Sequence, residues 1–196
     1  MKHATNITTS IRAITLSTSL AIAAGCSSEE PIPWPPQDSG ELVTYSEDVR
    51  DRFIERAEDA GFEASFSPTM RVEATPNLIY YDSQNREIVM PLWEEISPDD
   101  RAGFEMYGTV LPNMTGQEFF QETMQWFLIP HELGHYIQNE TGQESDDDRY
   151  ESEFNANEFA VAYWIAEGEE DRVARYVDAV TRINENSGSP IPDRCG

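Results

Sequence analysis

The motif HELGH at residues 131–135 combines the residue types of a metal site at helical spacing. His131 and His135 are four residues apart, so a helix would place both imidazoles on one face, where they can bind one metal ion. Zinc lowers the pKa of a bound water to about 7, and Glu132 can take the proton of that water as a general base. The third histidine of the chain, His3, lies at the N-terminus. The motif therefore predicts a zinc site with Glu132 as the catalytic base.

A catalytic zinc site needs a third protein ligand and keeps one position open. No further histidine is available, so we expect a carboxylate from the next predicted helix, which offers Glu151, Glu153 and Glu158. Glu153 lies on a stripe at helical spacing whose alanines would allow close packing against the motif helix, while the other two glutamates lie elsewhere around the helix. That stripe consists of Glu153, Ala156, Asn157, Ala160 and Trp164. We predict Glu153 as the third ligand and Asn157 as a residue that orients a ligating histidine.

The hydrophobic pattern predicts the elements that must position these residues. The motif helix should begin after a capping box of Thr115 and Glu118 and continue over 117–139, with a bend at Pro130, which cannot donate a backbone hydrogen bond. A β-rich pair of segments separated by turn residues predicts a hairpin. The other expected elements are a helix over 46–60 capped by Ser46, a strand over 70–75, hairpin strands over 78–81 and 87–90, and helices over 98–107, 150–166 and 170–183.

The N-terminal residues are typical of a secretion signal. A modest apolar stretch over 14–24 follows two basic residues and ends in small residues before Cys26. This layout resembles the lipobox of bacterial lipoproteins, which implies a signal peptide over 1–25, cleavage before Cys26 and a lipid on its sulfur. Ser27 resembles the second residue of lipoproteins sent to the outer membrane. The alternatives are an ordinary signal peptide with a chance cysteine, or a disulfide between Cys26 and Cys195.

The rest of the chain divides by composition. The proline-dense segment 26–40 is expected to be a tether, 41–184 a folded domain and 185–196 a loose tail. The acidic loop around 146–148 is expected to be solvated, with weak calcium binding as a minor alternative.

The HELGH motif and the downstream ExxAN pattern that begins at Glu153 together resemble zincin metallopeptidases of gluzincin type. The small ImmA/IrrE-like zincins are the nearest comparison, over about 118–164 and more weakly over the hairpin. The resemblance implies a small α+β zincin-like metallopeptidase domain with a short twisted sheet and an active-site helix carrying HELGH. It also implies zinc ligands at His131, His135 and Glu153. Pro130, directly before the motif, departs from the pattern of these families. Tyr136 and Tyr163 are not assigned as oxyanion-stabilising residues, and Tyr136 is expected to pack in the core.

The net charge of −24 excludes a nucleic-acid partner, because such a surface repels phosphates. We expect an acidic surface that is mainly solvated, although binding of cations or basic partners is an alternative. The predicted function is zinc-dependent hydrolysis of peptide bonds in a peptide or protein substrate. The predicted location is the bacterial cell envelope, with the membrane contacted through the lipid anchor alone. The alternative is a non-catalytic surface lipoprotein that keeps a structural zinc site and acts as a binding module. Structural sites are closed by four protein ligands, and the sequence offers three convincing ones.

Overall fold

The computed structural model describes residues 34–76, 78–143 and 149–186, all of which belong to one unit, Ile32–Gly196. The predicted signal peptide, Cys26, the first part of the tether, the acidic loop at 144–148 and most of the tail lie outside the described residues. In the described part of the chain, no helix has the length and apolar character needed to cross a membrane.

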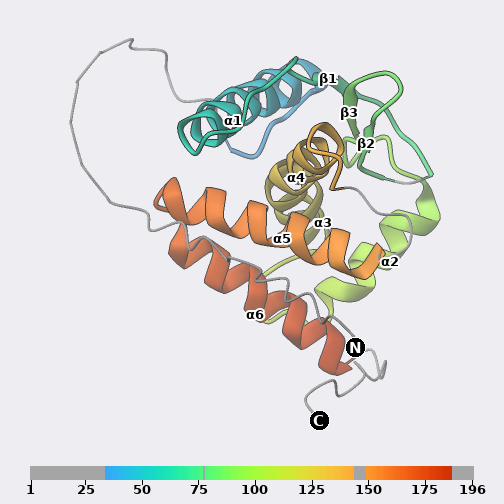
Figure 1. Ribbon diagram of the computed structural model, residues 1–196. Coiled ribbons are helices and arrows are strands. Elements are labelled where there is room, and N and C mark those ends of the chain that lie inside the picture. The colour runs from blue at the N-terminus through green and yellow to red at the C-terminus, as the bar shows by residue number, and fades with distance from the viewer. Residues whose placement is uncertain (1–33, 77, 144–148, 187–196) are drawn as a thin grey trace, which may run out of the picture. The chain divides into compact units, whose positions relative to one another are not determined.

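The fold is α+β, as predicted, with many helices and one small sheet (Figure 1). Helix α4 lies centrally and contacts α1 and strands β2 and β3, as well as α5, which in turn contacts α6. In chain order the elements are α1 (Ser39–Asp59), β1 (Thr69–Val72), β2 (Tyr80–Asp82), β3 (Glu87–Met90), α2 (Pro98–Gly108), α3 (Gly116–Phe120), the π-helix η1 (Gln121–Phe127), α4 (Leu128–Glu140), α5 (Arg149–Ala166) and α6 (Glu170–Asn186).

Helix α1 begins earlier than the sequence analysis predicts. Its N-cap is Asp38, whose side chain accepts a hydrogen bond of 2.9 Å from the backbone N–H of Glu41. The predicted cap, Ser46, lies buried inside the helix and donates its hydroxyl to the carbonyl of Val43. The prediction missed this first part because its residues include Val43 and Tyr45, which have low helix propensity. Tertiary packing of this segment outweighs that preference.

The segment before α1 packs against the domain. Trp34 lies with its ring centroid 5.1 Å from that of Tyr45, and the guanidinium of Arg172 lies 4.3 Å from the Trp34 ring. The same guanidinium lies 4.4 Å from the Trp126 ring and forms a bidentate ion pair with Glu122, with both contacts at 2.8 Å. From Trp34 onward, the predicted tether is therefore in contact with the folded domain.

The predicted hairpin is present. Strands β2 and β3 are antiparallel, with Tyr81 opposite Ile88, and Asp82 accepts hydrogen bonds from two backbone N–H groups in the turn. Strand β1 pairs in parallel with β3, which gives the strand order β1-β3-β2. Strand β2 therefore forms one edge of the sheet, and it contacts α4.

The motif helix contains a feature that the sequence analysis did not predict. The capping box of Thr115 and Glu118 is present, and helical structure continues to Glu140. The turns directly before α4 are π-helical, and the backbone N–H of Leu128 bonds to the carbonyl of Thr123, five residues earlier. Pairing over five residues allows the helix to accommodate Pro130, which has no N–H to donate four residues back. The helix therefore accommodates the proline through a π-helical segment.

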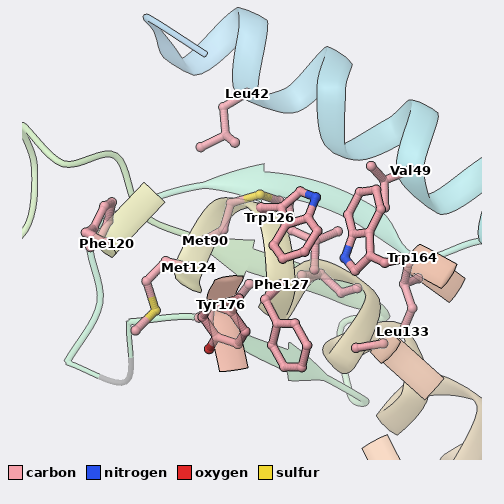
Figure 2. Close-up of a cluster of buried hydrophobic side chains, with 14 of the residues drawn as sticks. Leu42, Val49, Met90, Phe120, Met124, Trp126, Phe127, Leu133, Trp164 and Tyr176 are labelled. Carbon is pink, nitrogen blue, oxygen red and sulfur yellow. The ribbon is translucent and has the colours of Figure 1, made fainter. Parts of the chain in front are cut away.

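Helices α4 and α5 pack closely at the motif. A Cβ atom on Gly134 would lie 3.1 Å from the Cα of Ala156 and 3.2 Å from the side chain of Phe159, so glycine permits this approach. Large buried side chains from α1, β3, η1, α5 and α6 form the core beside α4 (Figure 2). These include Val49, Met90, Trp126, Phe127 and Tyr176. The motif helix is thereby fixed between the sheet side of the domain and α5.

Candidate metal centre

Three side chains from two helices converge at the HELGH motif. The Nε2 atoms of His131 and His135 on α4 lie 3.2 Å apart. Glu153 on α5 places Oε2 at 3.3 Å from Nε2 of His131 and 3.8 Å from Nε2 of His135. Among the described residues, these three form the group of histidine, cysteine and acidic side chains that could hold a metal ion. The structure therefore brings together the three predicted ligands.

Asn157 determines which ring nitrogen of His131 carries the proton. The Asn157 amide nitrogen donates to the carbonyl of Glu153 at 2.9 Å, so its oxygen Oδ1 is the atom that faces His131. Oδ1 lies 3.2 Å from Nδ1 of His131 and can only accept, so Nδ1 carries the hydrogen. Burial, followed by the nearby His135, lowers the pKa of His131 to about 4 and keeps the ring neutral at pH 7. Its Nε2 therefore presents a lone pair.

Gln138 determines which ring nitrogen of His135 carries the proton. Gln138 is buried, and its amide nitrogen donates to the carbonyl of Ser152 at 2.8 Å, which orients Oε1 toward the histidine. Oε1 accepts from Nδ1 of His135 at 2.9 Å and also from the hydroxyl of Ser152 at 2.9 Å. In the neutral ring, Nε2 of His135 is then also a lone-pair atom.

The resulting donor set fits a tetrahedral metal ion. Two imidazole lone pairs and one carboxylate oxygen converge with no hydrogen to share, which favours a cation between them. Zinc bond lengths of about 2.0 to 2.2 Å at tetrahedral angles require ligand atoms about 3.3 to 3.6 Å apart. The observed separations of 3.2, 3.3 and 3.8 Å lie close to that range. The combination of imidazole and carboxylate ligands is one that zinc accepts in catalytic sites.

Glu132 is held beside this group but does not belong to it. Its Oε2 accepts a hydrogen bond of 2.8 Å from the backbone N–H of Tyr81 in β2. The side chain is buried, and burial raises the pKa of Glu132 to about 7, although the hydrogen bond from Tyr81 acts in the opposite direction. A carboxyl with a pKa near neutrality is suited to accept a proton and release it again.

A cavity of about 810 Å³ opens over the four side chains. Its wall comes from the β2 region, η1, α4 and the start of α5. The lining residues are Leu78, Ile79, Tyr80, Tyr81, Met124, Leu128, His131, Glu132, His135, Arg149, Ser152, Glu153 and Asn157. The volume is large enough for part of a peptide.

The structure shows which of the candidate residues considered in the sequence analysis lie at the site and which do not. Glu151 and Glu158 are exposed and do not line the cavity. Tyr136 is fully buried and donates its hydroxyl to the carbonyl of Phe66, which confirms the predicted packing in the core. Tyr163 is also buried away from the cavity lining and packs against Phe53. The metal-binding, catalytic and orienting roles of the other residues stay predictions.

Sequence reasoning missed two contributors to the site. Gln138 lies three residues after His135 on the same helix face, and this spacing was the available signal. The backbone N–H of Tyr81 that holds Glu132 had no signal in the sequence, because the contact joins residues 51 positions apart.

Comparison with known families supports the resemblance over the helical part of the chain. Residues 118–179, about a third of the sequence, match the family model described as IrrE N-terminal-like domain, Peptidase_M78. The matched segment contains all four site residues and the helices that carry them. No curated protein and no solved structure gives a significant match to the chain. The match supports a zincin of ImmA/IrrE type and indicates a metallopeptidase-like domain.

Proposed function

We propose that this chain is a zinc-dependent peptidase that hydrolyses peptide bonds. The observation that carries the proposal is the convergence of two histidine lone pairs and the Glu153 carboxylate, with Glu132 beside them in an open cavity. The Peptidase_M78 match supports a site of this kind.

Within the proposal, His131, His135 and Glu153 would hold the ion. Bound zinc acts as a Lewis acid that polarises a carbonyl oxygen and lowers the pKa of water. Glu132 removes a proton from the attacking water, holds it on the carboxylate and passes it to the leaving amine. The hydrogen bond from Tyr81 keeps one carboxylate oxygen in place, which leaves the other oxygen of Glu132 to handle the proton.

Strand β2 is suited to align an extended substrate. It is an edge strand of the sheet, and Tyr80 and Tyr81 border the cavity, while the backbone N–H of Tyr81 is already bonded to Glu132. A peptide can add to such an edge through main-chain hydrogen bonds, and this mode of binding tolerates varied side chains.

The proposal includes an extracytoplasmic location. The signal-like N-terminus and Cys26 support a lipid anchor in a bacterial envelope, with the outer membrane as the expected site. Labelling of expressing cells with a fatty-acid analogue tests it. Cys26→Ser should abolish the label and release the protein from the membrane fraction, whereas retention of label on that variant would contradict the anchor.

Metal analysis and cleavage of a peptide library by the full chain test the catalytic proposal. We expect one zinc per chain, and we expect Glu132→Gln to retain the metal and lose at least about a hundredfold in rate. Glu158→Gln, an exposed glutamate on α5, is the matched control and should cleave normally. Absence of stoichiometric zinc, or full activity of Glu132→Gln, would contradict the proposal. Bound zinc without hydroxamate binding would instead favour the non-catalytic lipoprotein with a structural zinc site.

A further inference from the structure

One part of the cavity wall is apolar and adjoins the candidate metal centre. Leu128 precedes His131 by three residues on α4 and therefore lies on the same face of the helix, and Met124 comes from η1; both line the cavity. Leu78 and Ile79, which lead into β2, also line the cavity. These four side chains share one cavity with the candidate ligands and with Glu132.

Leu78 occupies this wall in a backbone conformation that leucine rarely adopts. Its φ is +62°, in the left-handed region that favours glycine and asparagine. The conformation is held by the N–H of Leu78, which donates to the carbonyl of Thr75, and by the Thr75 hydroxyl, which donates to the carbonyl of Leu78. Arg86 is the other described non-glycine residue with positive φ, and it lies in the hairpin turn, where this conformation is common. A large apolar side chain at position 78 therefore occurs in a strained backbone conformation, of the kind that clusters at active sites and ligand sites.

Met124 comes from a second unusual backbone segment, the π-helix η1. Wide π-turns change the direction of side chains relative to an uninterrupted α-helix, and they recur at functional sites. Within η1, Met124 is buried in the core with Trp126 and Phe127, and it also lines the cavity (Figure 2). Two irregular backbone segments, far apart in sequence, thus contribute apolar side chains to the same wall.

We propose that Leu78, Met124 and Leu128 form a specificity subsite for one large apolar side chain of the substrate, at a residue flanking the scissile bond. The inference rests on the proposed peptidase function and names its substrate class: peptides with a residue such as leucine or phenylalanine at that position. The wall lies beside Glu132 and the metal ligands, so a side chain seated there belongs to a residue close to the reacting carbonyl.

Matched glycine variants of the full chain test the subsite. Leu78→Gly removes the side chain and suits the left-handed backbone, so the fold and zinc content should be retained. Arg86→Gly makes the same backbone change outside the cavity. In the wild type, kcat/KM for a peptide with leucine at the preferred position should exceed that for its serine analogue. Leu78→Gly should reduce this ratio by about tenfold or more, and Arg86→Gly should leave it unchanged. Leu128→Ala should act in the same direction as Leu78→Gly.

A binding measurement separates the subsite from catalysis. Zinc-loaded Glu132→Gln should bind the leucine peptide more tightly than the serine peptide, and adding Leu78→Gly should remove the difference. Cleavage or binding without an apolar preference in the wild-type cavity, or a preference that survives Leu78→Gly, would overturn the subsite but not the peptidase function. Selective binding without any cleavage would overturn the peptidase function and leave the apolar subsite supported. Failure to bind or cleave any peptide would overturn both.

Discussion

Replacement of Gln138 by leucine should weaken zinc binding without touching a ligand atom. Gln138 accepts from Nδ1 of His135 at 2.9 Å, and its oxygen is oriented by a 2.8 Å bond to the carbonyl of Ser152. Without this acceptor, the ring of His135 is no longer restricted to the tautomer that directs a lone pair at the metal. Loss of such a partner typically reduces metal affinity about 10- to 100-fold, which corresponds to about 1.4 to 2.7 kcal/mol.

Competition with a chromophoric chelator at pH 7 measures the zinc affinity of the full-length variants. Gln125→Leu is the matched control, because Gln125 is equally buried, at 1 % exposed, but bonds to the carbonyl of Pro91 outside the metal centre. Ser152→Ala is a milder variant that retains Gln138 and should lower the affinity less. Wild-type affinity in a folded Gln138→Leu protein would refute the tautomer argument, as would an equal loss in Gln125→Leu.

Two further predictions concern stability. Arg172→Ala should lower the free energy of unfolding by about 3 kcal/mol, because it breaks a largely buried bidentate ion pair and removes a cation that contacts two tryptophan rings. The control is Arg182→Ala, which removes an exposed ion pair on the same helix and should cause no measurable change in urea unfolding. An equal loss in the two variants would contradict this assignment. In metal-free protein, burial raises the pKa of Glu132 from 4.5 to about 7, so this group favours the folded state less as the pH rises from about 4.5 to 7, while the lowered pKa of His131 acts in the opposite direction between about pH 4 and 6.5. Comparison with Glu132→Gln isolates the contribution of Glu132: in chelator, the stability of the wild type relative to this variant should fall by about 3 kcal/mol across this range, and parallel curves would argue against a raised pKa.

Local patterns in the sequence were sufficient for the elements around the site. Helical phase distinguished Glu153 from Glu151 and Glu158, and the structure places Glu153 alone of these beside the histidines. The capping box and the hairpin were predictable because their contacts join neighbours in sequence. Each of these features depends on a few residues close together in the sequence, and each has a recognisable local pattern.

Features determined by distant contacts were not predictable. The start of α1 depends on packing that overrides the β preference of Val43 and Tyr45, so a cap was predicted at Ser46, inside the helix. The parallel pairing of β1 with β3 joins segments with no local signal. Pro130 predicted an irregularity, but its form, a π-helix before the proline, depends on the surroundings of the whole helix.

The packing of Trp34 limits how far the cavity could move from a membrane. Arg172 holds the Trp34 ring against the domain, so residue 34 is fixed to the fold. If Cys26 carries the proposed lipid, seven residues lie between the anchor and Trp34, and the eight Cα–Cα steps span no more than about 29 Å even at full extension. The proposed peptidase would then remain close to the lipid headgroups. Substrates would have to approach the headgroups, which favours membrane-bound or membrane-adjacent polypeptides over freely diffusing ones.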